Sequence, residues 1–504
     1  MTRKIIFSII AVLAVLLILE SLSRLAESIL INTPDPQNPR SGWQTEFFQS
    51  FMDWHQPDSE LLWKYRANLD NPLLKTNSRH LLGREISQKK DDLFRILLLG
   101  DSSPVGLGLK SRQQAFGEIL RYLLDIEYRG NKKFELVNAA VSGYTSEQIR
   151  KFMELEGWAY DPDLILVYCG NNDASISGFA TDQEIMAAQK FPSARRFLAK
   201  LALYRILRAM MTSVTDRETP NSQPLKARVS PERYRQNLNH LADQCRNRNC
   251  PLIIIKPAVP YLWPAGLQFR LLTHITGDDG QLIFPDEMIN ILGRNIKYCL
   301  DRQRFRKLYG EGDIFTVSVY ESVYSDSMTP QNAIAYYSRL LRDNGDDPII
   351  YNNLGVSCWQ AGDYSNADKY LRTARSLYMS ENAAEDDPSL IAAGSPFLYN
   401  IAVNLLSMEP SPATVTLDTT REYFMYLDSA LQADYYSLRI KKSYCEKIDD
   451  FKNSDGIIVI DLPAIFMENG AERLFIDHCH PTPEGHLLIA EVLRDSIMAH
   501  AIVR

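Results

Sequence analysis

The sequence predicts an α/β fold with a parallel sheet, an all-α insertion and one N-terminal transmembrane helix. From residue 95 onward, short apolar runs alternate with helical patterns, which is typical of a parallel sheet covered by helices on both faces. This rhythm stops near residue 328, where a helical pattern with small residues begins, and it returns near residue 456. A continuous apolar run opens the chain and predicts the transmembrane helix.

Length and composition narrow the class of protein. The chain has 504 residues, too many for one ordinary domain, and 45% of them are hydrophobic, so it can bury a sizeable core. Its net charge is −7 and no run of Lys and Arg stands out, which excludes a general nucleic-acid binder. The seven cysteines are odd in number, so at least one is unpaired within the chain. Cys245 and Cys250 lie close enough to pair in an oxidising compartment, and their pairing stays open.

The N-terminal segment predicts a membrane anchor. Arg3 and Lys4 precede an apolar run over residues 5–19. A helix of that length spans about 22 Å, short of the roughly 30 Å hydrocarbon core, so it also fits a signal-peptide core. Leu22 and Leu25 extend the apolar face, and no clear cleavage site follows, which favours an anchor. The two cations place the N-terminus in the cytoplasm and the rest of the chain in the periplasm or outside the cell.

The α/β part contains five expected strands and four expected helices. The strands are short apolar runs at residues 95–99, 134–137, 164–169, 252–255 and 456–460. The helices show apolar positions at helical spacing or capping patterns, at residues 115–124, 145–158, 230–245 and 485–498.

Four further segments flank or interrupt these elements. Residues 32–39 are rich in proline and predict a spacer, whereas the aromatic residues of 43–65 predict a stretch that packs on the main body. An apolar-striped helix at 197–211, expected to pack on the body, and a polar loop at 212–228 interrupt the alternation of strands and helices.

The insertion resembles the tetratricopeptide repeat. Residues 351–374 carry the repeat's small positions at Gly355, Ala367 and Ala374, which allow two antiparallel helices to approach closely. Neighbouring helices are expected at 333–341, 399–406 and 422–431, where the match to the repeat is poor. We expect a compact helical insertion; a protein partner bound to it is a weaker hypothesis, since such helices also pack only on themselves.

Four polar segments are the candidates for chemistry. They lie at residues 100–103, 138–143, 170–173 and 477–481, the first three directly after expected strands and the last just before the final helix. Because the carboxyl ends of parallel strands meet at one edge of a sheet, these segments are expected to lie together. Each segment taken singly is a common turn.

Each segment offers a group suited to acyl transfer. Ser102 stands at a strand-to-helix turn, which exposes its hydroxyl and offers its backbone N–H. Gly143 allows its own N–H to approach a ligand closely, and an asparagine amide in 170–173 is a neutral donor for an oxyanion. Asp477 and His480 are three residues apart, so the carboxylate can reach and orient the imidazole.

Taken together and in this order, the four segments resemble the blocks of the SGNH (GDSL-type) hydrolase family. The resemblance implies a three-layer, flavodoxin-like sandwich. It maps the catalytic roles onto Ser102, His480 and Asp477, and the oxyanion hole onto Ser102, Gly143 and Asn172. One departure is Ser103, where the family name implies leucine at a position that is not catalytic.

The resemblance also sets the expected domains and activity. The family core covers roughly residues 90–325 and 440–504. We therefore expect an anchor at 1–27, a spacer and packing segment at 28–90 and a first hydrolase part at 91–325. The helical insertion follows at 326–438 and the second hydrolase part at 439–504. The resemblance implies acyl transfer through a covalent intermediate on Ser102, with no cofactor and no metal. Water as acceptor gives an esterase, possible substrates being O-acetyl groups on envelope or extracellular carbohydrate or lipid acyl esters; a sugar hydroxyl gives an O-acyltransferase.

Two other functions remain open from the sequence. The insertion would make the chain an envelope scaffold if the active site were weak, although four intact blocks argue against that. A metal hydrolase that uses His478, His480 and His486 is the least favoured, because it leaves the serine and the asparagine unexplained.

Overall fold

The computed structural model describes a large part of the chain, and the following account concerns that part. It covers residues 19–24, 54–70, 74–89, 91–129, 132–178, 180–188, 226–263, 329–381, 388–409, 417–434 and 438–503. Among these residues, no helix is both long enough and apolar enough to cross a bilayer. Most of the predicted anchor, the proline-rich spacer at 32–39 and the predicted helix at 197–211 lie outside the described residues.

A five-stranded parallel sheet forms the centre of the α/β part. Its order is β4-β3-β5-β8-β9, so that the first strand of the sheet lies between the second and the third. This is the flavodoxin-like order 2-1-3-4-5, as the resemblance implied. The strands are β3 (Leu93–Gly100), β4 (Lys133–Asn138), β5 (Leu164–Tyr168), β8 (Leu252–Lys256) and β9 (Ile457–Asp461).

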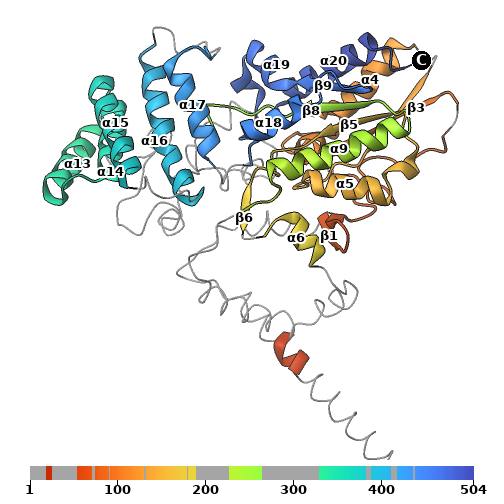
Figure 1. Cartoon of the computed structure of the whole chain (residues 1–504), viewed down its shortest axis with the longest axis horizontal. Helices are drawn as coiled ribbons and strands as arrows, with labels where there is room; N and C mark the ends of the chain where they lie inside the picture. Colours follow the sequence, from red (N-terminus) through yellow and green to blue (C-terminus); the bar gives the residue numbers. More distant parts are fainter. Residues whose placement is uncertain are drawn as a thin grey trace, which may run out of the picture.

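Helices cover both faces of this sheet and make three layers (Figure 1). One face packs against α4 (Phe116–Glu127), α19 (Leu462–Glu468) and α20 (Pro483–Ala499). Alternate strand residues point to the opposite face, where they pack against the other set of helices. That set is α5 (Ser146–Leu155), α9 (Pro231–Asn247) and α18 (Lys442–Asp449).

Two short antiparallel strand pairs accompany the main sheet. The first pairs β1 (His55–Asp58) with β2 (Leu62–Tyr65) and packs on the sheet's core. The second pairs β6 (Ile176–Gly178) with β7 (Lys226–Ala227) and is followed along the chain by α9. The short helix α6 (Asp182–Ala187) follows β6. These elements surround the second and third polar segments.

Between β8 and β9, the described residues form five further helices besides α18, seen apart from the sheet in Figure 1. They are α13 (Pro330–Asn344), α14 (Pro348–Gln360), α15 (Tyr364–Glu381), α16 (Pro388–Ser407) and α17 (Glu422–Ala433). A Cβ at Gly355 of α14 would lie 2.7 Å from Leu371 Cγ of α15, so glycine permits the close approach of these two helices. The assignment to the tetratricopeptide repeat stays a prediction.

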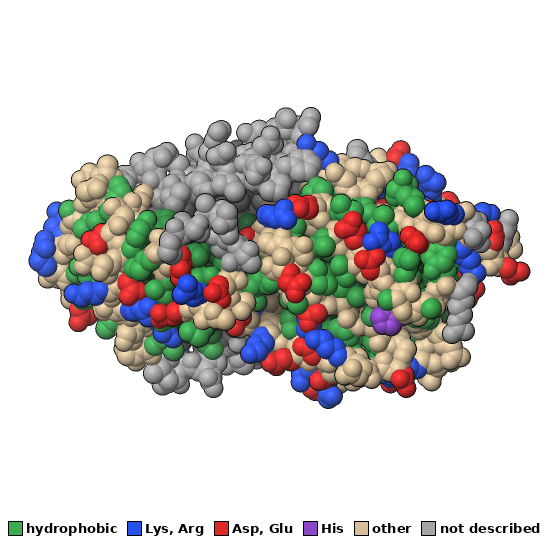
Figure 2. Space-filling model, turned by 90° about the horizontal axis from the view of Figure 1, so that it is seen from above, with side chains coloured by type: hydrophobic (Ala, Val, Ile, Leu, Met, Phe, Trp, Pro, Cys, Tyr) green, Lys and Arg blue, Asp and Glu red, His purple; other side chains and the backbone are tan. Residues whose placement is uncertain are grey.

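Two smaller points concern the distribution of surface charge and the state of Cys245 and Cys250. Acidic and basic side chains are interspersed over the described part of the face in Figure 2, in keeping with the modest net charge. Cys245 and Cys250 are both free thiols, so the pairing left open by the sequence is not formed.

Candidate active site

The nucleophile turn is built by the end of β3. A Cβ at Gly100 would lie 2.5 Å from Tyr168 O and 2.6 Å from Pro104 Cγ, so only glycine fits between β3 and the following turn. Asp101 then caps the short helix α3 (Ser102–Val105) by accepting a hydrogen bond from the Ser103 N–H at 3.0 Å. Ser102 is therefore the first residue of a helix and is half-buried at the carboxyl edge of the sheet.

The segment before α20 forms a tight loop around a buried carboxylate. Asp477 Oδ1 accepts the backbone N–H groups of Cys479 and His480, both at 2.9 Å. The Ile476 N–H donates to His480 O at 2.8 Å and closes the loop. The imidazole of His480 is thus fixed by the backbone as well as by its own ring contacts.

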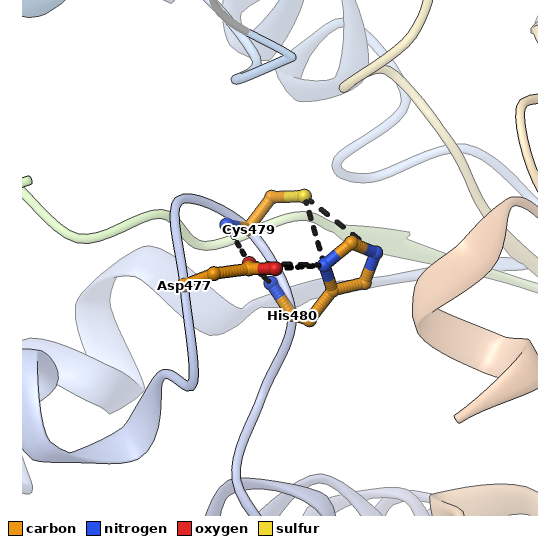
Figure 3. Close-up of side chains that lie close together, drawn as sticks. All are labelled: Asp477, Cys479 and His480. Carbon is orange, nitrogen blue, oxygen red and sulfur yellow. Dashed lines mark hydrogen bonds and ion pairs between the residues drawn. The ribbon is translucent and has the colours of Figure 1, made fainter. Parts of the chain in front are cut away.

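These two segments meet and form a chain of three side chains. His480 Nε2 lies 2.7 Å from Ser102 Oγ, and His480 Nδ1 lies 2.7 Å from Asp477 Oδ2. Figure 3 shows the Asp477 carboxylate directed at the His480 ring. All three predicted residues lie within hydrogen-bonding distance in the order that acyl transfer requires.

Electrostatics favour an ionised carboxylate beside a basic imidazole. Burial by itself raises the pKa of Asp477, but the His480 and His478 rings and the hydrogen bonds hold it well below its usual range. Burial lowers the pKa of His480, but the charge of Asp477 and the hydrogen bond that the ring donates to this carboxylate outweigh that effect, so the pKa is raised. His480 is thereby a stronger proton acceptor than an ordinary histidine.

Ser103, the departure from the family name, connects the two segments. Its hydroxyl donates to Cys479 O at 3.3 Å, across 376 residues of sequence. The side chain is buried, and a leucine at this position cannot make the bond. The substitution therefore ties the nucleophile turn to the loop that carries His480.

The two other predicted oxyanion donors lie on either side of the nucleophile. Gly143 follows β4 and Asn172 follows β5, and these strands are the two neighbours of β3. Gly143 has a φ of 82°, in the left-handed region that favours glycine. Asn172 Nδ2 donates one hydrogen to Tyr144 O at 3.1 Å, which fixes the amide and leaves its second hydrogen for a substrate.

The other polar residues of the third segment have structural partners. Asp173 accepts hydrogen bonds from both the backbone N–H and the hydroxyl of Ser146. Asn171 Oδ1 accepts the Ile440 N–H at 3.0 Å. Ile440 follows the helical insertion, so this bond connects the returning chain to the active-site edge.

A metal fits this site poorly. Asp477, Cys479 and His480 form a group whose potential ligand atoms lie within 4.8 Å of one another. However, the carboxylate and the imidazole are already paired with each other, and burial holds the pKa of the Cys479 thiol well above its usual range, so it is not a thiolate. His486 is not directed at His480: its Nδ1 accepts the Phe116 N–H at 3.2 Å, and its ring stacks on Phe116.

Sequence reasoning missed the side chains that hold the second segment. Tyr65 is fully buried, and its hydroxyl accepts the Ser142 N–H at 3.0 Å. Trp63 donates to Ser142 O, and Arg228 donates to Gly143 O. The aromatic residues of 43–65 predicted a packing segment, but no local pattern specified the partner. Arg228 fell in the expected loop at 212–228, of which the described residues 226–227 form β7.

Comparison with known proteins agrees with this geometry. Residues 98–274 match the GDSL-like Lipase/Acylhydrolase family, and no curated protein matches the chain. Among solved structures, the chain is similar to the psychrotrophic esterase EstA from Pseudoalteromonas sp., with 18% identity and a TM-score of 0.20 over 33% of this chain and 61% of that one. The chain thus spans about three fifths of the length of that esterase.

Two further solved structures are matched along nearly their whole length. One is a catalytic mutant of Axe2, an acetylxylan esterase from Geobacillus stearothermophilus, with 14% identity and a TM-score of 0.21 over 50% of this chain and 95% of that one. The other is AlinE4, an SGNH-hydrolase family esterase, with 17% identity and a TM-score of 0.21 over 52% of this chain and 100% of that one.

The family match covers residues 98–274, about a third of the chain, and the described sheet has the flavodoxin-like strand order. This part of the chain is therefore similar to the GDSL-like Lipase/Acylhydrolase family. In the described residues, further helices lie between the fourth and fifth sheet strands in chain order.

Proposed function

We propose that the protein is a serine esterase that cleaves acyl esters through Ser102, His480 and Asp477. The supporting observation is the continuous chain from Asp477 Oδ2 through the His480 ring to Ser102 Oγ, with 2.7 Å at each contact. His480 takes the Ser102 proton as the serine oxygen attacks the ester carbonyl. The leaving alcohol takes that proton from His480, and an acyl-enzyme remains.

The acyl-enzyme is then resolved by an acceptor. Water gives an esterase, with His480 as general base for the second attack. A sugar hydroxyl gives O-acyl transfer through the same residues. The Ser102 and Gly143 N–H groups and the Asn172 amide bind the oxyanion in both steps. O-acetyl groups on envelope or extracellular carbohydrate are the substrate class we propose, by analogy within the family.

A fluorophosphonate probe tests the chemistry directly. The wild-type chain should be labelled covalently, and Ser102→Ala should abolish labelling and lower ester hydrolysis on the order of 10⁶-fold. Ser103→Ala is the matched control for labelling, since it removes the hydroxyl of the adjacent residue, which donates to Cys479 O and not to His480. A wild-type protein that is folded but neither labelled nor active would contradict the proposal.

The location of the enzyme is a separate proposal that rests on the sequence. We expect residues 5–19 to anchor the chain with the hydrolase part outside the cytoplasm. A reporter enzyme fused after residue 30 should be active only when exported. Activity of a cytoplasm-specific reporter at the same position would reverse this orientation.

A further inference from the structure

We propose that Trp63 and Arg228 are positioning residues that hold the peptide groups on either side of Gly143, so that the Gly143 N–H is directed at the substrate oxygen. Neither residue belongs to the four polar segments. Trp63 lies in β2, before the alternation of strands and helices begins, and Arg228 follows β7, within the segment that interrupts this alternation. The inference rests on the proposed function, because it concerns the oxyanion hole of that same reaction.

Trp63 fixes the direction of the Gly143 N–H by binding the carbonyl oxygen of the same peptide group. Its Nε1–H donates to Ser142 O at 3.1 Å, and this carbonyl shares a peptide group with the Gly143 N–H. The described chain has no cis peptide bond, and in a planar trans peptide the C=O and the N–H point in opposite directions. Holding the carbonyl toward Trp63 therefore turns the N–H away from it. Within the described residues, no hydrogen bond from this N–H is recorded.

Arg228 holds the next peptide group in the same way. Its Nη1 donates to Gly143 O at 2.8 Å. Its Nε and Nη2 donate to the two carboxylate oxygens of Asp182 at 3.1 and 2.8 Å, which fixes the guanidinium plane. The two side chains are only 11% and 4% exposed, so water competes little for these bonds. Both carbonyls that flank the Gly143 Cα are thus held by side chains from distant parts of the chain.

Glycine makes this support necessary. A residue without Cβ populates positive and negative φ about equally, so the φ of 82° at Gly143 is not enforced by the residue itself. An oxyanion donor lowers a barrier only if it is oriented before charge develops. The Trp63 ring also disfavours a side chain at this position, because a Cβ on residue 143 would lie 3.2 Å from Trp63 Cζ2.

Trp63→Phe is the first test, measured on p-nitrophenyl acetate and with phenylboronic acid as inhibitor. The Ser102 oxygen adds to boron while His480 accepts its proton, and the resulting tetrahedral boronate places an oxygen in the oxyanion hole. We expect kcat to fall about tenfold, a part of the 10²- to 10³-fold loss for a removed donor, with KM within about twofold. The inhibition constant of the boronate should rise by the same factor as kcat/KM falls, which a loss of packing alone does not produce.

Trp158→Phe is the matched control. Its indole also donates one side-chain hydrogen bond, to Gln244 Oε1 at 2.6 Å, and it is partly buried against the same core. This variant should retain wild-type kcat and boronate inhibition. Thermal unfolding of both variants shows whether they are equally folded.

Arg228→Lys is the second test, and it tests the proposed positioning role by itself if Trp63→Phe does not fold. Lysine keeps the charge beside Asp182 but not the fork that also reaches Gly143 O. Arg233→Lys is its control, because Arg233 makes a two-point ion pair with Glu147. If the wild type hydrolyses the ester but both variants match their controls, the inference is wrong and the proposed function stands. A wild type without activity or labelling overturns both.

Discussion

The α/β sheet and the helical insertion place their polar side chains differently. All five residues of β5 are buried and all are apolar or aromatic, and polar groups begin only where the strand ends. In the insertion, by contrast, polar side chains lie inside the helix interfaces: Asn400 of α16 donates to Asn352 Oδ1 of α14 at 2.7 Å, and both side chains are fully buried.

This difference shows which polar groups remain available to a substrate and which only hold helices together. A buried asparagine whose partners lie within the helices is satisfied and has little left to offer a substrate. The polar groups at the strand ends retain capacity: Ser102 Oγ faces only a histidine that can accept its proton, and Asn172 has one amide hydrogen remaining. The two regions are connected near the site by Ile440, whose N–H bonds to Asn171 and whose side chain packs against Gly170.

Asp477→Asn should give the largest loss of kcat. A small loss would contradict the placement of the chemistry at the strand ends. An amide cannot hold the imidazole in the same tautomer or stabilise its cation, so we expect kcat to fall about 10⁴-fold. Esterase assays with labelling kinetics measure this. Asp434→Asn in the segment after α17 also removes a buried carboxylate, one paired with Arg439, and serves as the control. An equal loss of kcat in folded samples of both variants would place chemistry outside the strand ends.

Asn172→Ala should follow, with a loss of about 10²- to 10³-fold in kcat and little change in KM. The amide binds charge that develops only in the transition state, so ground-state binding is spared. Asn400→Ala is the control in the insertion and should change stability but not kcat. Loss of substrate binding without loss of kcat in Asn172→Ala would contradict its assigned role.

The pH profile of the wild type tests the electrostatics of the site. His480 must be neutral to accept the Ser102 proton, and its pKa lies above the ordinary value of 6.5 because of Asp477. The value of kcat/KM should therefore fall about tenfold per pH unit as the pH drops below this raised pKa. An acid limb centred below 6.5 would show that Asp477 does not stabilise the imidazolium.

Ile440→Ala and Leu371→Ala form the subtlest test, because both remove a buried aliphatic side chain. Each should lower the free energy of unfolding by about 2 to 5 kcal/mol. Only Ile440→Ala should also lower kcat, by a few-fold, since it alone packs against the segment that carries Asn172. Denaturant unfolding and kcat at a temperature where both are folded provide the measurements. Equal kcat in both variants would mean that the packing of Ile440 against Gly170 does not affect the site.

The sequence predicted the elements whose signals are local. The five sheet strands were expected within two residues of their observed ends, because each is an apolar run bounded by turn residues. Ser102, Asp477 and His480 were singled out because the four polar segments, in this order, resemble the blocks of the SGNH hydrolase family; each segment alone is a common turn. The histidine set of the metal alternative is not brought together, for a reason that the sequence does not contain: His486 contacts Phe116 of α4 rather than His480.

The sequence by itself predicted the order of strands along the chain, the candidate nucleophile Ser102 and the local pairing of Asp477 with His480. Only the tertiary structure showed which side chains hold the peptide groups on either side of Gly143. Trp63 and Ser142 are 79 residues apart and Arg228 and Gly143 are 85 apart, and both bonds run from a side chain to a backbone carbonyl, an acceptor that every residue carries. Such a contact leaves no residue pattern at its acceptor end, so it becomes visible only when the chain is folded.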